Sequence, residues 1–363
     1  MVEFLNSSSI IKIVIYILLE TKPHILIAGI GGASLGTEIQ KCLLQSNRYV
    51  LYGCDISRFA FGHYQKGFKD TFVINRTQYI KEIKEIVEKY KIHVIIPGGE
   101  EPLKILTSER ERFHKNGTII AANSIDVVKL CSDKLNLFNN LNKSIPIPKS
   151  FSSDIELNLE IIPYPCIIKP SLESGGSKFV FLVSNRQELS RYIKFFTEND
   201  QKMLIQEYIP LHEGEFTVGV LSSTKGSIIG SIAMKRIFDS KLSVSFKSKH
   251  GLISSGYSQG IIDEFKDVRI QAENIAKKIN SKGPLNIQGR MLEGIFYPFE
   301  INPRFSASTY LRSLAGFNEI DVYLRHLLFN ENFTINSFKK GYYLRSFTEE
   351  FVKIGDIKNG EMD

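Results

Sequence analysis

The sequence predicts an α/β part, an open parallel sheet with helices on both faces, followed by an α+β part with antiparallel strands. Two patterns support this expectation. Up to residue 123, short apolar runs alternate with segments of helical spacing, as in β-α-β units. Beyond it, strand-like runs follow one another across short turns such as Ser223–Gly226, which indicates antiparallel pairing. The 363 residues are enough for two or three domains.

The first domain is predicted at 23–123 and begins with a buried strand at 24–30. The glycine-rich stretch 31–36 then turns the chain into a helix that continues through Leu43, and apolar spacing predicts a further helix at 80–90. The remaining strands of this domain are expected at 49–56, 71–75, 93–99 and 118–124. The ligand crevice of such a sheet lies at the carboxyl ends of its strands.

The N-terminal extension, 1–22, contains the apolar run Ile10–Leu19. No basic residue precedes this run, no small-residue cleavage site follows it, and it is too short to span a bilayer. We therefore expect an extra helix or strand on the first domain rather than a signal peptide or membrane span. The 4 cysteines form no CxxC pair, which favours reduced thiols and a cytoplasmic protein.

The formal charge of +7 comes from scattered lysines and arginines. They do not interleave with aromatic residues as a nucleic-acid groove requires, so no nucleic-acid partner is expected. A basic protein is equally suited to small anionic substrates such as nucleotides. None of the 7 histidines shows metal-ligand spacing, which argues against a zinc site.

The second domain is predicted at 124–330, with a C-terminal segment at 331–363 after it. A lobe of about 165–203, containing a glycine loop between two short strands, is expected to move. The segment Asp239–Gly260 is rich in Ser, Lys and Gly and is predicted to be a mobile loop. The other expected elements are two helices in 124–142 with Ser132 capping the second, a helix at 264–279, a hairpin turn at Glu293-Gly294 and a closing helix at 317–329.

The strongest candidate site lies in the stretch Phe299–Arg304. In a strand, Glu300 and Asn302 point to the same face, and two oxygen-bearing side chains there suit a hard cation such as Mg²⁺. Gln288 on the preceding strand adds an oxygen, and Arg304 continues the face toward a phosphate. A solvated polar strand face is the alternative, but the apolar neighbours of these residues argue against it.

A second candidate is Lys169 at the end of a strand, followed by the loop with Gly175, Gly176 and Ser177. Lysine supplies a point charge for phosphate, and glycines let backbone N–H groups approach phosphate oxygens. The alternative is an ordinary glycine hairpin. On the next strands, Glu207 is a weaker candidate for the adenine edge and Glu215 for the ribose hydroxyls.

Acceptor recognition is predicted in the segment after Arg304. Ser306 and Ser308 supply hydroxyl groups, and the fork of Arg312 suits a substrate carboxylate. The sequence leaves open the alternative that Arg312 lies on a solvated helix face. In the first domain, residues 29–36 resemble a dinucleotide fingerprint with Asp55 at the spacing of the ribose-binding acid, which leaves an NAD-linked oxidoreductase as an outside alternative.

The order of these motifs resembles the ATP-grasp superfamily, and the ending NPRFSASTYLRSLAGFNE is similar to the carbamoyl-phosphate-synthetase large-subunit type of carboxylate–amine ligase. The likeness runs from about His24 to Phe329. It implies a Rossmann-like pre-ATP-grasp domain followed by a two-lobed ATP-grasp fold. Phe179 follows Ser177-Lys178 where the family often has glycine, and Asp239–Gly260 matches nothing residue by residue.

The resemblance also implies roles for individual residues. Lys134 and Lys169 would contact the ATP phosphates, the Glu207-Tyr208-Ile209 segment would face adenine, and Glu215 would hold the ribose. The metal ligands would be Gln288, Glu300 and Asn302, and Arg304 would serve the transferred phosphoryl group. In the first domain, Gly31, Gly32 and Glu100 would face the acceptor.

By this resemblance the protein is expected to be an ATP-dependent ligase that forms an acyl phosphate and ADP and passes the acyl group to an amine. Its cofactors would be ATP and Mg²⁺, with Mn²⁺ as an alternative ion. Its partners would be a small carboxylate and a small amine, and a homodimer is one possible assembly. The alternatives are a kinase-like phosphotransferase of the same fold and a non-catalytic nucleotide-binding module.

Overall fold

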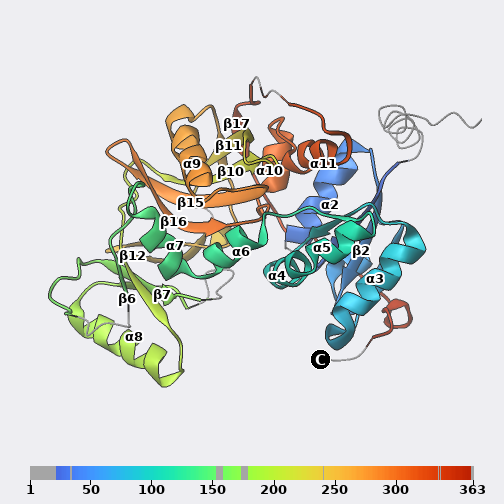
Figure 1. Ribbon diagram of the computed structural model, residues 1–363. Coiled ribbons are helices and arrows are strands. Elements are labelled where there is room, and N and C mark those ends of the chain that lie inside the picture. Colours follow the sequence, from blue (N-terminus) through green and yellow to red (C-terminus); the bar gives the residue numbers. More distant parts are fainter. Residues whose placement is uncertain are drawn as a thin grey trace, which may run out of the picture. The chain divides into compact units, whose positions relative to one another are not determined.

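The computed structural model describes residues 22–32, 35–152, 158–172, 179–239, 241–333, 335 and 337–360 (Figure 1). The chain divides into two compact units. Unit 1 comprises the chain up to Ala122 with Ile320–Asn332 and Phe347–Asp363, and unit 2 comprises Asn123–Glu319 and Phe333–Ser346. The apolar run Ile10–Leu19 lies outside the described residues. Across the described ranges, no helix has both the length and the apolar character needed to cross a membrane.

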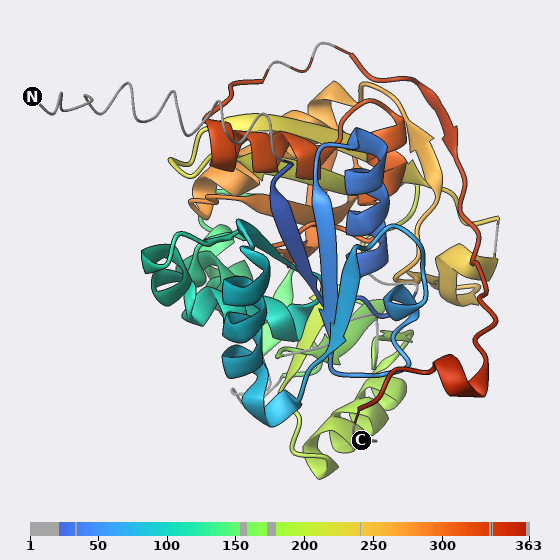
Figure 2. The ribbon, with the colours of Figure 1, turned by 90° about the vertical axis from the view of Figure 1, so that its right-hand side faces the viewer.

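Unit 1 is built on a five-stranded parallel sheet with the strand order β3-β2-β1-β4-β5. Figure 2 shows β1, β2 and β3 side by side in blue. The strands are β1 His24–Ala28, β2 Val50–Asp55, β3 Asp70–Val73, β4 Val94–Pro97 and β5 Ile119–Ile120, and the helices are α2 Leu35–Ser46, α3 Tyr79–Tyr90, α4 Glu100–Ser108 and α5 Arg110–Lys115. Residues 25–28 and 94–97 are buried, as expected for central strands that are covered on both faces. The predicted parallel α/β sheet is confirmed.

The C-terminal part of the chain differs from the expected division. Helix α11, Glu319–Phe329, belongs to unit 1 from Ile320 onward, where the Tyr49 hydroxyl donates to Asp321 Oδ1 at 2.9 Å. Lys358 also bonds within unit 1, through its Nζ to the carbonyl of Thr71 at 2.7 Å. Strand β17, Gly341–Tyr343, instead extends the sheet of unit 2. Local sequence patterns do not reveal which unit each C-terminal segment joins, because that division depends on contacts between segments that are distant in sequence.

Unit 2 contains a six-stranded antiparallel sheet with the order β16-β15-β10-β11-β14-β17. Glu293 and Gly294 both have positive φ, 53° and 74°, so the predicted hairpin turn between β15 and β16 is confirmed. The strands besides β17 are β10 Glu215–Ser222, β11 Ile228–Arg236, β14 Gly260–Ile262, β15 Pro284–Leu292 and β16 Ile295–Asn302. The helices of this unit besides α8 are α6 Ile125–Ser132, α7 Lys134–Leu141, α9 Lys266–Lys278 and α10 Thr309–Leu314.

The two faces of this sheet have opposite character. One face carries Val218, Ala233 and Ile287 and packs on the apolar side of α9, which contributes Ala272 and Ile275 (Figure 1). Because side chains alternate along a strand, the intervening positions fall on the other face. Those positions are polar on three adjacent strands, namely Glu215, Thr217, Asn286, Gln288, Arg290, Glu300 and Asn302. The sheet therefore uses one face for the core and keeps the other for polar side chains.

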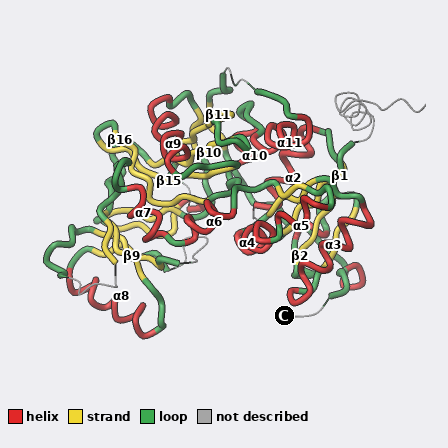
Figure 3. The backbone as a smooth tube through the Cα atoms, in the orientation of Figure 1, coloured by secondary structure: helices red, strands yellow, loops and turns green. Residues whose placement is uncertain are grey.

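A four-stranded sheet with the order β6-β9-β7-β8 forms a separate small lobe of unit 2. Its core includes Cys166, Ile168, Leu189 and Phe196, and α8 packs on it (Figure 3). The elements are β6 Ser150–Ser152, β7 Cys166–Pro170, β8 Phe181–Val183, α8 Arg186–Glu198 and β9 Met203–Glu207. This sheet starts earlier and ends later than the predicted lobe of 165–203, because β6 and the end of β9 pair within it.

Two local expectations in unit 2 were wrong. The segment predicted to be a mobile loop contains a short 3-10 helix, Lys241–Ser243, and a hairpin formed by β12 Val244–Ser248 and β13 Gly251–Ser254. The cap of α7 is Asp133, whose side chain accepts from Asn136 N, whereas Ser132 bonds back to its own helix through the Val128 carbonyl.

Candidate functional site

A cleft in unit 2 opens between the small lobe, the large sheet and the β12–β13 hairpin. It encloses about 750 Å³ including its open side, a size that suits a nucleotide. Its lining includes Ile167, Lys169, Val180 and Gln206 from the lobe, Arg290, Phe299 and Glu300 from the large sheet, and Leu252, Ile253 and Ser254 from the hairpin and its end. Of the residues predicted from the sequence, the cleft brings together Lys134, Lys169, Glu207, Tyr208, Ile209 and Glu300.

Lys169 is held deep in this cleft and is only 7% exposed. Its Nζ donates to Gln206 Oε1 at 2.9 Å and to the Phe299 carbonyl at 2.8 Å. Burial, together with the nearby Lys134, lowers the pKa of Lys169 to about 7, while Glu300 acts in the opposite direction. A negatively charged ligand favours the ammonium form and would raise this pKa again. The lysine is therefore placed to respond to phosphate.

Lys134 reaches the same cleft from the first turn of α7. The capping of this turn by Asp133 fixes where the helix begins, and the backbone N–H of Lys134 donates to the Ser171 carbonyl at 3.1 Å. A helix N-terminus and a lysine both favour an anionic ligand. The two lysines from different elements thus give one side of the cleft a positive character.

Glu207–Ile209, at the end of β9 and directly after it, forms an edge of the cleft, and each of its residues makes a hydrogen bond that fixes it. Glu207 Oε2 accepts from Lys149 N at 3.2 Å, and the Tyr208 hydroxyl accepts from Leu252 N at 2.9 Å. The Ile209 carbonyl accepts from Arg290 Nη1 at 2.7 Å. A flat ligand at this edge would meet a backbone whose position is already determined.

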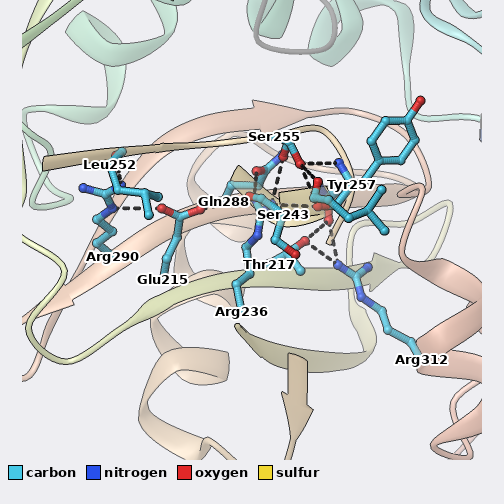
Figure 4. Close-up of polar contacts among 12 residues, drawn as sticks. Glu215, Thr217, Arg236, Ser243, Leu252, Ser255, Tyr257, Gln288, Arg290 and Arg312 are labelled. Carbon is cyan, nitrogen blue, oxygen red and sulfur yellow. Dashed lines mark hydrogen bonds and ion pairs between the residues drawn. The ribbon is translucent and has the colours of Figure 1, made fainter. Parts of the chain in front are cut away.

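Glu215 does not have the surroundings expected of a ribose-binding residue. It is 0% exposed, and its two carboxylate oxygens accept from Arg236 Nη1 at 3.2 Å and from Arg290 Nε at 2.9 Å (Figure 4). The geometry makes Glu215 the shared counter-ion of two buried arginines, and we therefore do not propose it as a ribose ligand. The alternation of polar positions at 286, 288 and 290 was the available signal for Arg290.

The three expected metal ligands lie on adjacent positions of β15 and β16. Gln288 is paired with Glu300 in the strand register, and Asn302 Nδ2 donates to Glu300 Oε1 at 3.1 Å. No cluster of three His, Cys, Asp or Glu side chains suited to a metal occurs among the described residues. One carboxylate with two amide oxygens does fit Mg²⁺, which commonly takes one or two protein carboxylates together with phosphates and water.

Arg304 does not continue the strand face, because β16 ends at Asn302. Its backbone N–H donates to the Asn302 carbonyl at 2.8 Å, and its Nη1 donates to the Phe305 carbonyl at 2.9 Å. The guanidinium is thus placed by a turn directly after the proposed metal ligands. Its expected contact with the transferred phosphoryl group stays a prediction.

The structure buries the side chains that were expected to recognise the acceptor. The hydroxyls of Ser306 and Ser308 bond to each other at 2.8 Å. Arg312 is 1% exposed and donates to Thr217 Oγ1 at 2.9 Å, while its Nη1 lies 3.3 Å from Glu319 (Figure 4). The solvated helix face was therefore wrong for Arg312, and the guanidinium already has a carboxylate partner.

We expect Arg312→Met to lower the free energy of unfolding by about 3–5 kcal/mol, because the buried carboxylate of Glu319 loses its charged partner. Urea unfolding followed by tyrosine fluorescence or circular dichroism measures the loss. The double substitution Arg312→Met with Glu319→Leu should recover much of it, since no unpaired charge remains. A single substitution that costs less than about 1 kcal/mol would contradict this role.

The remaining candidate residues lie in unit 1 or outside the described ranges. Gly31 is half-buried and Gly32 exposed, and Glu100 starts α4; none of the three is among the described residues that line the cleft above. Gly175, Gly176 and Ser177 belong to residues 173–178, which the structure does not describe.

The fingerprint-like stretch of unit 1 serves close backbone packing. A Cβ on Gly36 would lie 1.9 Å from the Gly29 carbonyl oxygen, and one on Gly98 would lie 2.0 Å from it. Asp55, expected at a ribose, accepts instead from the backbone N–H groups of Ile30 at 2.8 Å and Ser57 at 3.0 Å. Close packing in the turn thus explains the glycines and the aspartate, so these residues no longer favour an NAD-linked enzyme.

Comparison with known families agrees with the cleft geometry. Residues 131–308, which supply the lobe, the large sheet and most of the cleft, match the family described as the ATP-grasp domain. Residues 131–308 of this chain are thus similar to the ATP-grasp domain. The match covers the segments that hold Lys134, Lys169, Glu207, Glu300 and Asn302.

Individual relatives and solved structures resemble this chain over longer stretches than residues 131–308. The carbamoyl phosphate synthase large chain of Pasteurella multocida is 28% identical over 240 residues, which are 62% of this chain and 21% of that protein. This chain thus spans about a fifth of the length of such relatives. Biotin carboxylase of Campylobacter jejuni in a β-γ-ATP complex has a TM-score of 0.62 at 17% identity and covers 87% of this chain and 73% of its own. L-amino acid ligase of Bacillus licheniformis has a TM-score of 0.61 at 14% identity, with 85% and 74% covered.

Proposed function

We propose that the protein is an ATP-dependent ligase that activates a carboxylate as an acyl phosphate, releases ADP and joins the acyl group to an amine. The observation that carries the proposal is the convergence of Lys134, Lys169 and Glu300 on one cleft that also has an apolar side. Cations for phosphate, a carboxylate for a metal ion and an apolar slot for a base are the groups that a magnesium nucleotide needs.

In this proposal each group has a defined task. The base would lie along the Glu207–Ile209 edge, and Lys134 and Lys169 would offset the negative charge of the phosphates. Glu300, Asn302 and Gln288 would hold Mg²⁺, which when bound draws charge from the phosphoryl group in transfer. A carboxylate oxygen attacks the γ-phosphorus and ADP leaves; the amine then attacks the acyl carbon and phosphate leaves.

The relatives support this reaction class through the activities in their names. One structural neighbour is named a ligase of L-amino acids, another a carboxylase of biotin, and the sequence relative a synthase of carbamoyl phosphate. A phosphotransferase of the same fold would release ADP with a single acceptor. The proposed ligase requires both a carboxylate and an amine for sustained ADP release, so a two-substrate screen distinguishes the two reactions.

We expect ATP or ADP with Mg²⁺ to raise the melting temperature, whereas NAD and NADP leave it unchanged. At a ligand concentration about 100 times the dissociation constant, binding adds about 2.7 kcal/mol to stability. That amount corresponds to a rise of about 5–10 °C for a domain of this size. Differential scanning fluorimetry measures it. A rise with NAD alone would reverse the assignment, and nucleotide without Mg²⁺ serves as the control for the metal.

A further inference from the structure

Two arginines connect the β12–β13 hairpin and the chain after it to the large sheet. Arg290 Nη2 donates to the Leu252 carbonyl at 2.8 Å. Arg236 Nη2 donates to the carbonyls of Ser255 at 2.8 Å and Tyr257 at 3.1 Å (Figure 4). Backbone carbonyls on both sides of residues 253 and 254 are therefore fixed by guanidinium groups that originate on β15 and β11.

Glu215 joins the two arginines from the strand between them. β10 lies between β11 and β15 in the sheet, and the register places Glu215 opposite Arg290. All three side chains are buried, at 0% exposure for Glu215 and at most 7% for the arginines. In this water-poor setting charge-assisted hydrogen bonds are strong, and the planar fork of arginine bonds a carboxylate and carbonyls at once.

The arginine-held segment is a wall of the cleft. Leu252, Ile253 and Ser254 line it, and the Leu252 N–H also donates to the Tyr208 hydroxyl. The Arg290 guanidinium lies 4.7 Å from the Tyr208 ring centroid, and a Cβ at Gly251 would come within 2.5 Å of that ring. The hairpin thus packs tightly against the edge that is proposed to face the base.

Arg290 also controls that edge directly, since its Nη1 donates to the Ile209 carbonyl. Each of its three nitrogens is bonded to protein: Nε to Glu215, Nη1 to Ile209 and Nη2 to Leu252. Although Arg290 also lines the cleft, these bonds tie it to two backbone segments, and we expect its effect on a bound ligand to pass mainly through them. Arg236 bonds to Glu215, Ser255 and Tyr257, and its Nη1 also donates to Gln288 Oε1 at 3.5 Å, so it contacts one of the proposed metal ligands as well.

We infer that Arg290 and Arg236 are positioning residues that preassemble the nucleotide slot by holding the Leu252–Ser254 wall and the Ile209 edge together through Glu215. The inference rests on the proposed function, because it takes a nucleotide to be the ligand of this cleft. A slot assembled before binding avoids the cost of ordering its walls when the ligand arrives. Loss of either arginine should weaken nucleotide binding. Loss of Arg290, whose three nitrogens bond to Glu215, Ile209 and Leu252, should leave the phosphoryl-transfer step nearly unchanged.

The test uses Arg290→Lys and Arg236→Lys in the full chain, with binding of ADP and Mg²⁺ measured by calorimetry. Lysine keeps a positive charge beside Glu215, and the other arginine stays in place, so the buried carboxylate remains paired. Lysine lacks the fork that bonds two carbonyl-bearing segments. We expect the dissociation constant for ADP and the KM for ATP to rise about 10-fold or more in both variants, with kcat within about twofold in Arg290→Lys.

A second readout and a matched control separate positioning from general weakening. Backbone amides of residues 251–257 should exchange hydrogen faster in both variants. Arg269→Lys, on α9, is the control, because Arg269 bonds Ser231 and lies over the Phe338 ring away from the cleft. It should bind ADP like the wild type. Tyr208→Phe, which removes only the hydroxyl that holds Leu252, should weaken ADP binding a few-fold without touching a buried charge.

The outcomes distinguish the inference from the proposed function. Unchanged ADP affinity in Arg290→Lys, Arg236→Lys and Tyr208→Phe, with a wild type that binds ADP, would overturn the positioning role and leave the ligase proposal standing. A large loss of kcat with unchanged affinity in Arg290→Lys would also overturn it, because Arg290 would then act on the reacting groups. Failure of the wild type to bind any nucleotide would refute the proposed function itself. If a lysine variant does not fold, Tyr208→Phe alone decides the matter.

Discussion

Glu300→Gln is expected to abolish ADP formation while the protein remains folded. Glu300 is the only carboxylate among the three proposed metal ligands, and glutamine keeps its size but removes its charge. A metal ion stabilises the charge of the transition state by several kcal/mol. Because about 1.4 kcal/mol corresponds to a tenfold change in rate, we expect a loss of about 100-fold or more.

The order of damage among the ligands is the sharper part of this prediction. Asn302→Ala should be milder than Glu300→Gln, because it removes a neutral ligand and the hydrogen bond that orients Glu300. Gln288→Ala should be milder still, since water can replace an amide oxygen on Mg²⁺. Steady-state ADP release of the three variants, with circular dichroism as the folding control, measures the order. Wild-type turnover in folded Glu300→Gln would remove the metal assignment.

Lys169→Met should have the second large effect, a loss of ADP formation of about 100-fold, because a buried phosphate contact loses its charge. The same substitution should not destabilise the nucleotide-free protein. Methionine fills a similar volume and spares the desolvation that lowers the pKa of Lys169. The carbonyl of Phe299 and the amide oxygen of Gln206 lose their hydrogen-bond donor, which limits the gain in stability from removing the buried amine. Activity and urea unfolding at pH 7, measured side by side, test both parts.

Lys169 also predicts a pH dependence whose sign follows from its lowered pKa. The folded pKa is about 7 and the ordinary value is 10.5, so between these values the unfolded chain binds one more proton than the folded chain. Stability should therefore rise with pH across this window, by up to about 1.4 kcal/mol per pH unit, and Lys169→Met should lack that contribution. Unfolding curves at pH 6.5, 8 and 9.5 measure it. Parallel pH profiles for the two proteins would show that Lys169 stays charged throughout.

The same titration links nucleotide binding to protons. Phosphate favours the charged lysine, so binding of ADP above pH 7 should be accompanied by proton uptake, and its affinity should fall as the pH rises. Calorimetry in buffers of different ionisation enthalpy measures the uptake. Lys169→Met, which has no proton to take up at this position, is the matched control.

Much of the architecture could be predicted from local patterns. The alternation of apolar runs and helical spacing predicted the parallel sheet of unit 1, and the Glu293-Gly294 step between two strand-like runs predicted the β15–β16 hairpin. Strand alternation put Glu300 and Asn302 on one face, the preceding strand and the family resemblance added Gln288 to the proposed metal set, and the observed register places Gln288 beside Glu300. These features are local, because strand periodicity and turn chemistry act over a few residues.

Other features depend on the folded chain. The segment predicted to be a loop is a hairpin held by Arg236 and Arg290, because its carbonyls find donors on strands that are distant in sequence. The packing of α11 and the C-terminal tail within unit 1 likewise depends on contacts between distant residues, such as the hydrogen bond between Tyr49 and Asp321, 272 residues apart.

The sequence by itself determined the order of the elements, the polar and apolar faces of the strands and the residue types available to the site. Only the tertiary structure decided which of those residues meet. Glu215 shows the difference: the sequence suggested it as a partner for ribose hydroxyls, but the neighbouring strands place two arginines beside it and bury all three side chains. A buried charge takes the nearest charged partner, since leaving it unpaired in a low-dielectric interior is costly. That partner is chosen by sheet order, which no local pattern contains.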